Sequence, residues 1–441
     1  MSPVPEVSVS APHDPYAPLR LPGFRWFLVS ILTMAMGAQI QGVVVAWQMY
    51  AFTHDPLALG IVGLAEALPF VGLALPAGHV ADVRNRRRVA LTALVVLFLC
   101  ALGLAVLSAL AARAPRLAVA VRFPIYGVIV ICGAARSFLL PARNALAAEV
   151  VPRPLFASSV AWRTGIWQVA AVTGPAVGGV LYATVGPTAS YVVAGVLMAA
   201  AFVAVANVQV VVARAAARSA SLAASVREGL VFLLERRLFL GAMTLDLLAV
   251  LFGGATALLP IFAEDILHSG PRALGLLRAS PAIGAVLMSV VLALRPPHRR
   301  AGPKFLGAVG VFGVTIVGFA LSRSLALSVF LLAIGGAADM LSVNFRSTMV
   351  QVLVPPSMLG RVSAVNQIFI GSSNEIGAFE SGVAAKLLGT ISSVVVGGSI
   401  TIGVTALVAW FVPELRRLDR IETDADARAP EVSRSPAAAR S

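Results

Sequence analysis

The sequence predicts an all-α integral membrane protein with twelve transmembrane helices in two six-helix repeats. The first observation is composition: 59% of the 441 residues are hydrophobic and 12% are charged, whereas about a quarter of a soluble domain is charged. The second is a series of apolar runs near the roughly 20 residues that cross a hydrocarbon core of about 30 Å. The third is that features of the first half of the chain recur in the second half.

Short polar breaks separate the predicted spans. The twelve spans cover residues 24–50, 57–80, 88–112, 122–150, 155–184, 188–212, 238–262, 271–294, 304–322, 325–352, 361–387 and 393–413. The predicted domains are therefore a six-helix bundle over 23–212, a linker over 213–237 and a second bundle over 238–415. We expect cytoplasmic, disordered tails at 1–22 and 416–441, because neither has an apolar period, and the first lacks the pattern of a secretory signal.

The linker contains the stretch "SLAASVREGLVFLLERRLF" at residues 221–239. Its apolar residues at helical spacing are Leu222, Val226, Leu230 and Leu234. They lie opposite Arg227 and Glu228, so the spacing predicts an amphipathic helix along the inner membrane surface. A plain solvated linker is the alternative.

The distribution of basic residues predicts the orientation. The net charge is +14, and with both termini placed inside, the cytoplasmic segments hold 23 of the 34 Lys and Arg residues, the outer loops six and the spans five. This excess is the positive-inside pattern of a multi-pass protein of the inner (plasma) membrane. It accounts for the positive charge without nucleic acid as a partner.

The two halves of the sequence match each other in register. "DPLALG" at 55–60, before the second span, reappears as "GPRALG" at 270–275, before the eighth. With an offset of 203 residues, Arg143 falls on Arg346, Gly174 on Gly377 and Gly179 on Gly382. Two parallel repeats predict two bundles that rock about a central site.

Motifs of several other functional classes are absent from the sequence. Cys100 and Cys132 lie in predicted spans without a Cys-x-x-Cys spacing, so neither a metal site nor a disulfide is expected. No Gly-x-x-x-x-Gly-Lys-Ser/Thr phosphate loop and no Gly-x-Ser-x-Gly elbow occurs. We expect no enzyme activity and no cofactor.

The stretch "GHVADVRNRRRVA" at 78–90 gathers charge between two apolar runs. Its basic residues anchor the topology, but its pattern Gly-x-x-x-Asp-x-x-x-Arg-Arg also resembles the loop between the second and third helices of the major facilitator superfamily. The resemblance implies a gate latch, in which Asp82 faces the N-terminus of the eleventh helix and an arginine of the fourth. The residues carried over to this gate are Gly78, Asp82, Arg84, Arg86, Arg87, Arg143 and Gly360.

Two further stretches narrow the resemblance. "GPAVGG" at 174–179 is similar to the Gly-Pro motif in the fifth span of the superfamily's exporters and antiporters, which implies close packing at Gly174, Gly178 and Gly179 and a bend at Pro175. "PPSMLGRVSAVNQ" at 355–367, followed by "NEIGAFESG" at 374–382, resembles the enterobactin-exporter branch. That branch also contains drug exporters.

Acidic residues inside predicted spans are candidates for proton coupling, because an ionised side chain in hydrocarbon is costly. The candidates are Asp246, Glu375, Asp339, Glu66 and Glu380. Asp246 and Glu375 lead because they are expected near the midplane, as is Asp339, while Glu66 and Glu380 are expected further out. Arg136, Arg163 and Arg278 could pair with these acids, and static ion pairs that only hold helices together are the alternative.

Amides and aromatic rings are candidates for a substrate cavity. They are Gln39 and Gln41 in the first span and Trp162, Arg163, Trp167 and Gln168 in the fifth. Such groups suit a bulky, partly aromatic substrate, although interfacial anchoring or packing is the alternative for the tryptophans.

These features together predict a monomeric secondary transporter that exports a small, siderophore-like molecule in exchange for protons by alternating access. A multidrug or antibiotic efflux pump is the first alternative. A membrane receptor or regulatory subunit that resembles a transporter is an alternative of another class. An importer also remains possible, because a gate latch does not define the direction of transport.

Overall fold

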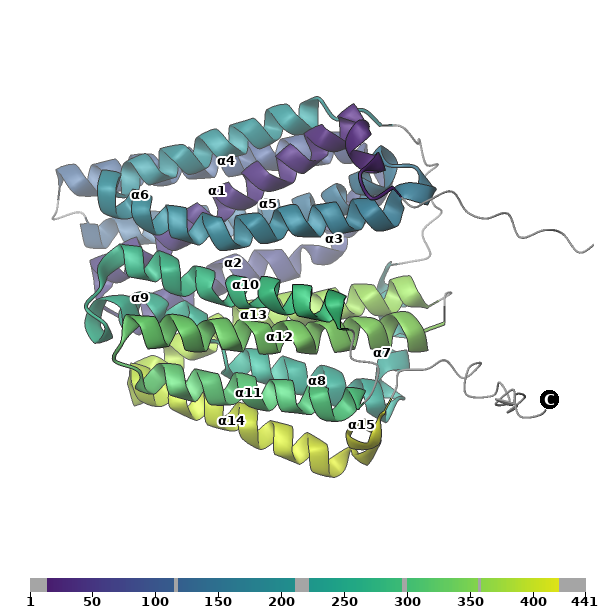
Figure 1. Cartoon of the computed structure of the whole chain (residues 1–441). Coiled ribbons are helices and arrows are strands. Elements are labelled where there is room, and N and C mark those ends of the chain that lie inside the picture. The colour runs from purple at the N-terminus through teal and green to yellow at the C-terminus, as the bar shows by residue number, and fades with distance from the viewer. Residues whose placement is uncertain (1–13, 115–117, 211–221, 296–299, 356–357, 420–441) are drawn as a thin grey trace, which may run out of the picture.

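Two bundles of helices stand side by side in the computed structural model, which describes residues 14–114, 118–210, 222–295, 300–355 and 358–419 (Figure 1). The first bundle contains α1 (Pro22–Thr53), α2 (Pro56–Gly72), α3 (Ala74–Val83), α4 (Arg86–Arg113), α5 (Ala118–Val150) and α6 (Phe156–Ala206). After α7 (Leu222–Leu234), the second contains α8 (Arg237–Phe252), α9 (Leu259–Ile261), α10 (Gly270–Leu294), α11 (Ala301–Leu321), α12 (Leu325–Leu353), α13 (Leu359–Leu388), α14 (Thr390–Phe411) and α15 (Pro413–Arg417). The predicted all-α membrane fold is confirmed.

The helices are consistent with twelve spans. Nine helical stretches of the described chain are long and apolar enough to cross a membrane, and the bent pair α2 and α3 makes a tenth. The 51-residue helix α6 holds the predicted fifth and sixth spans together, which meet at Gly186. α13 matches the predicted eleventh span in extent, although it carries charged residues at Arg361, Glu375, Glu380 and Lys386.

Three spans differ from the prediction in their local geometry. The fifth and sixth spans have no loop between them, because Gly186 adopts a φ of 77° that a residue with a side chain rarely adopts, directly before Pro187. The seventh span is not one continuous helix: it breaks at Gly253 and continues through short 3-10, α and π turns to Ile266. Ser381 of α13 donates a hydrogen bond to the Gly254 carbonyl at 3.1 Å, which satisfies a backbone group that the break frees.

Glycines bring the two bundles into contact in two places that the internal repeat relates. A Cβ on Gly179 of α6 would lie 2.9 Å from the Gly275 Cα of α10, and a Cβ on Gly382 of α13 would lie 2.6 Å from the Gly60 Cα of α2. Gly179 and Gly382 are the same position of the repeat, as are Gly60 and Gly275. Each crossing therefore joins the second span of one half to the fifth span of the other.

One buried apolar cluster crosses between the bundles, and it lies at the end opposite the described chain termini, Asp14 and Asp419 (Figure 1). It includes Val44 and Leu59 of the first bundle and Phe262 of the second. Two further clusters in the described residues each belong to a single bundle, at the end that bears the termini. We call these two ends the closed end and the termini-bearing end.

The predicted disorder of the two tails is wrong at their inner edges. Trp162 donates an indole hydrogen bond to the Pro15 carbonyl at 3.0 Å, which holds residues 14–20 against the first bundle. The Asp419 side chain accepts the Arg300 backbone N–H at 2.8 Å, and the backbone N–H of Ala301 donates to the Asp419 carbonyl at 3.0 Å. These contacts give both segments enough burial and hydrogen bonding to be ordered.

The linker helix forms as α7 and packs against α13. A Cβ on Gly229 would lie 2.8 Å from the Arg361 carbonyl, and the Arg361 guanidinium pairs with Glu228. Leu233 is buried and Leu234 is 54% exposed, so the predicted apolar stripe is shifted by one residue at this end of the helix. The side chains of Leu222, Val226 and Arg227 lie outside the described residues.

Candidate functional site

Polar contacts hold the two bundles together at the closed end. Lys386 of α13 donates to the Asp55 carboxylate at the start of α2 at 3.0 Å, and the Tyr50 hydroxyl at the end of α1 donates to Asp265. At the termini-bearing end, within the described parts of the chain, we find no hydrogen bond or ion pair between the bundles with both partners defined. Polar contacts therefore join the bundles at one end and, within the described residues, not at the other.

A cavity of about 450 Å³ lies between the bundles above the closed end. Its described walls come from α1, α2, α4, α5 and α6 of the first half and from α8, α10, α11, α12 and α13 of the second half. The walls are mixed: apolar side chains such as Leu59, Phe312 and Leu332 lie beside amide and charged groups. This size and composition suit a small organic molecule.

The first-bundle wall of the cavity carries an ion pair between Glu66 of α2 and Arg136 of α5. Glu66, which was expected further out together with Glu380, lies ten positions into α2 and faces the inter-bundle space. Arg136 was one of the basic residues expected to pair with an acid. Both side chains remain partly exposed, at 40% for Arg136 and 25% for Glu66, because they open onto the cavity.

The second-bundle wall carries Arg278 of α10, which crosses to the other bundle. Its guanidinium donates to the Gly42 carbonyl of α1 at 3.0 Å. A Cβ on Gly42 would lie 3.4 Å from an Arg278 nitrogen, so the glycine leaves room for this approach. Arg278 therefore links the bundles at the level of the cavity.

Asp339 of α12 also lies on the second-bundle wall, and it connects the cavity to a buried ion pair. Arg346, about two helix turns further along α12, donates to the Asp246 carboxylate of α8 at 2.7 Å. Arg346 and Asp246 are 4% and 7% exposed, while Asp339 opens onto the cavity. Arg346 interacts electrostatically with both carboxylates. The cluster thus holds two acids and one base, and only one of the acids faces the cavity.

The corresponding arginine of the first bundle, Arg143, has a different environment. It lies close enough to Arg163 of α6 for the two like charges to interact. Arg163 donates to the Asn144 side-chain oxygen at 3.5 Å and lies over the Phe27 ring. Within the described residues, neither arginine has an ion pair, and the Nε atom of each is buried without a hydrogen-bond partner. Two positive charges therefore lie together here.

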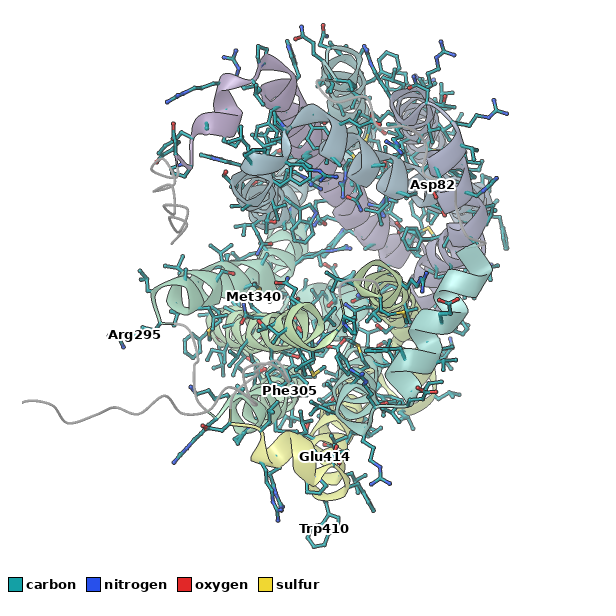
Figure 2. The ribbon with its side chains drawn as sticks, turned by 90° about the vertical axis from the view of Figure 1, so that its right-hand side faces the viewer. Asp82, Arg295, Phe305, Met340, Trp410 and Glu414 are labelled. Carbon is teal, nitrogen blue, oxygen red and sulfur yellow. The ribbon has the colours of Figure 1, made fainter. Side chains whose placement is uncertain are left out.

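The latch implied by the gate motif is not made in this conformation. Asp82 lies exposed at the end of α3, on the termini-bearing end of the first bundle (Figure 2), and has no hydrogen bond or ion pair within the described residues. Arg84 is exposed as well, and Gly78 and Arg87 are partly buried. Gly360 lies in the first turn of α13, where its surroundings fall outside the described residues.

Arg86 of the same motif has a partner that sequence reasoning missed. It forms an ion pair with Glu149 of α5, and both side chains are largely buried, at 16% and 14% exposure. Glu149 lies at the end of its predicted span, on the same side of the membrane as the charged loop. That shared level was the signal that could have identified the pair.

The remaining candidates fall in different places. Gln39 and Gln41 line the cavity, and Gln41 donates to the Cys132 sulfur at 3.5 Å. Four candidates are outside its described lining, because they lie in the first turns of α6 near the termini-bearing end: Trp162, Arg163, Trp167 and Gln168. Their assignment to the cavity is therefore wrong for this conformation.

Glu380 is the remaining acid whose surroundings the structure describes. Glu380 lies with Phe379, Val383 and Leu387 in a small apolar groove of α13, and no hydrogen bond or ion pair to it occurs within the described residues. The surroundings of the Glu375 side chain fall outside the described residues, although the neighbouring Asn374 lines the cavity.

The glycine motif of α6 allows close packing on two sides. Gly174, Pro175, Gly178 and Gly179 are all buried. A Cβ on Gly174 would lie 2.6 Å from the Gln39 Cβ of α1, whereas Gly179 faces α10 of the other bundle. The motif thus packs α6 within its own bundle and against its neighbour.

Two membrane-buried bundles around an inter-bundle cavity define a transporter, and the comparisons with known proteins agree. The family model described as transmembrane secretion effector matches residues 13–439. The chain is 24% identical over 405 residues to the multidrug efflux pump Tap of Mycolicibacterium fortuitum, covering 89% of this chain and 96% of the relative. It is 24% identical over 415 residues to the uncharacterized MFS-type transporter YfiS of Bacillus subtilis (strain 168), covering 88% of this chain and 90% of that one.

A solved structure shares the fold. The crystal structure of a POT family transporter in complex with a thioalcohol-conjugated peptide superposes with a TM-score of 0.68 at 13% identity, over 89% of this chain and 96% of that one. The chain belongs to the transmembrane secretion effector family of major facilitator superfamily transporters. It is a multi-pass membrane transporter and not an enzyme.

Proposed function

We propose that this transporter is a proton-coupled exporter that moves a small organic molecule across the inner (plasma) membrane by alternating access. The observation that carries the proposal is the position of Asp339, which faces the cavity and interacts with the Asp246–Arg346 pair. A substrate in the cavity and a proton on these acids would therefore act on the same network.

The charge balance of this network supports proton binding. With Asp246 and Asp339 both ionised, Arg346 leaves one negative charge uncompensated among the helices, and such a charge is costly in a membrane. One proton shared by the two carboxylates neutralises the cluster. A substrate that approaches Asp339 changes this balance and so changes the affinity for the proton.

The positive-inside distribution supports placing the termini-bearing end in the cytoplasm. The conformation described above is then open to the cytoplasm and closed outside, which is the state that loads an export substrate. In the opposite state, the Asp82 carboxylate would meet Arg143 and the N-terminus of α13 as the termini-bearing end closes.

This gate is testable with the Asp82→Asn variant. It should leave the stability of the resting state unchanged, because Asp82 has no partner there, and it should slow transport severalfold. The measurement is initial transport rate together with thermal unfolding of the purified protein. Full transport by Asp82→Asn would contradict the latch.

The substrate class is proposed from sequence similarity to other exporters and from the charged residues of the cavity wall. Siderophore export is supported by the resemblance of residues 355–367 and by two arginines on the cavity wall, Arg136 and Arg278, which suit acidic oxygen groups. Multidrug efflux is the second candidate, and the observation that favours it is the similarity to the pump Tap along most of both chains.

The central experiment uses the purified protein in liposomes that hold a pH-sensitive dye. A catecholate siderophore, a macrolide and a lipophilic cation are added in turn, and proton movement and compound movement are both recorded. We expect one compound to move protons in the wild type and at least tenfold less in Asp339→Asn. The matched control is Glu414→Gln, an exposed acid of α15 in the second bundle (Figure 2).

The outcomes separate the parts of the proposal. Movement of a compound without protons would refute proton coupling but leave transport intact. Proton movement driven by several unrelated compounds would favour multidrug efflux over a siderophore-like substrate. Unchanged coupling in Asp339→Asn would remove this residue from the mechanism.

A further inference from the structure

A groove lies on the outside of the first bundle, away from the cavity and at its termini-bearing end. It has a volume of about 620 Å³ and runs between α3, α4 and α5. Its walls are apolar along most of their length, with Val80, Val89, Val96 and Phe138 among the contributors, and Arg84 and Arg88 lie at its end. The described lining of this groove shares no residue with that of the inter-bundle cavity.

The bend between α2 and α3 explains why the groove exists. The two helices meet at an angle of 47° at Leu73, and Pro76 of α3 has no N–H to donate to the carbonyl of Gly72, four residues before it. Beyond the bend, α3 packs mainly on α5 and barely touches α4, so α5 forms the floor between two diverging helices. The corresponding helix of the second bundle, α10, is continuous from Gly270 to Leu294.

The groove faces the lipid. The exposed apolar residues of α4 follow one helical stripe, Val95, Leu99, Leu102 and Val106, as expected for a face that contacts acyl chains. The same stripe continues towards the groove through Thr92 and Arg88, which are both exposed. The arginine end of the groove therefore lies where α4 begins, at the level of lipid head groups rather than acyl chains.

The chemistry at that end favours an anion. Arg84 and Arg88 are both exposed, and neither forms an ion pair within the described residues. They flank the N-terminus of α4, where Asn85 accepts the Arg88 backbone N–H at 3.1 Å and the helix dipole is positive. Basic residues beside an apolar crevice at this level of the membrane match a negatively charged phospholipid, whose head group and chain need both surfaces.

We propose that this groove binds one anionic phospholipid, with an acyl chain between α3 and α4 and the phosphate between Arg84 and Arg88. The site is independent of the transported substrate. It places a lipid against the bend that shapes α3, at whose end Asp82 lies.

Native mass spectrometry of the full chain tests the head-group preference. The purified protein is mixed with equal amounts of phosphatidylglycerol and phosphatidylcholine that carry the same acyl chains. We expect the first tightly held lipid to be phosphatidylglycerol by at least fivefold in the wild type and by less than twofold in Arg84→Gln/Arg88→Gln. The matched control is Arg416→Gln/Arg417→Gln, two exposed arginines at the same end of the other bundle, which should keep the preference.

Photo-crosslinking locates the lipid without relying on a charge change. Phosphatidylglycerol with a diazirine in its acyl chain should label residues 89–96 and 131–138 severalfold more than the lipid-facing helices α11 and α12. Ala134→Phe, which fills the groove, should remove this excess, and thermal unfolding checks that the variant folds. Equal retention of both lipids by the wild type, equal loss in the two arginine variants, or uniform labelling of the helices would each overturn the proposal.

Discussion

Corresponding arginines of the two bundles differ in how their charge is balanced. Arg346 of α12 is 4% exposed and bonded to Asp246, with Asp339 nearby. Arg143 of α5, at the same position of the repeat, has another arginine, Arg163, as its charged neighbour. The repeat therefore conserves a positive charge at this depth but not its counterion.

The difference gives the two bundles opposite local charge at this depth. Two arginines leave the first bundle positive, while two acids and one arginine leave the second negative when all groups are ionised. Asp55 and Gly270 correspond in the two halves of the repeat with an offset of 215 residues. With the same offset, Asp246 of the second half corresponds to Ile31 of the first, which is apolar. The second bundle thus has a self-contained network that can take up a proton, and the first has a positive pair that can receive an acid from elsewhere.

The largest expected effect is a difference in the free energy of unfolding between variants of the two arginines. Arg346→Gln strands Asp246 in a buried site, and loss of one partner from a buried ion pair costs about 3 to 5 kcal/mol. Arg143→Gln strands no acid and should change the free energy of unfolding by about 0.5 kcal/mol or less. Denaturant unfolding of both purified variants in detergent measures this contrast, and equal losses would mean that Arg143 has a buried partner too.

Asp246 shows what the sequence could and could not predict. Its position in the seventh span and its depth follow from hydropathy alone. Its partner does not, because Asp246 and Arg346 are 100 residues apart and the spacing of residues along two helices does not fix which faces meet. The pairing also bears on tests of proton coupling, because Asp246→Asn leaves Arg346 without its counterion and should itself be destabilising.

More of the fold than of the site could be predicted from the sequence. The helices of the described residues are consistent with the twelve predicted spans, because a run of about 20 apolar residues in a membrane must satisfy its backbone internally. The break at Gly253 and the position of Glu66 in the cavity depend on how neighbouring helices pack. The cavity candidates of α6 failed for the same reason: composition suggested Trp162 and Trp167, but their level in the helix places them beyond the described lining.

The second prediction tests a feature that the two bundles share, the paired glycine crossings. Gly179→Val and Gly382→Val each force a side chain against backbone of the opposite bundle, and such overpacking costs about 1 to 3 kcal/mol. The two variants should lose similar stability and should both open the closed end. Gly127→Val of α5 is the control, since a Cβ there meets nothing within 4 Å.

Thermal unfolding measures the stability of the glycine variants. Opening of the closed end is measured by the reaction of the Leu59→Cys thiol with a water-soluble reagent. A loss in only one of the two crossings would show that the closed end is not held symmetrically. A loss in Gly127→Val as large as in the others would attribute the effect to valine in a helix rather than to the contact.

The smallest expected effect concerns the ion pair that joins the bundles at the closed end, between Lys386 and Asp55. Both side chains are partly exposed, at 53% and 33%, so the pair contributes about 1 kcal/mol or less. Lys386→Met should therefore shift the balance towards opening of this end by no more than about fivefold, since 1.4 kcal/mol corresponds to tenfold. Distances between spin labels at Phe123 and Leu388 report that balance, and Arg323→Gln, an exposed base at the same end, is the control. The Tyr50–Asp265 hydrogen bond and the two glycine crossings remain in Lys386→Met. A complete switch to the open form would therefore mean that the closed end depends on charge. It would also mean that the packing of Gly179 and Gly382 contributes little to the stability of that end.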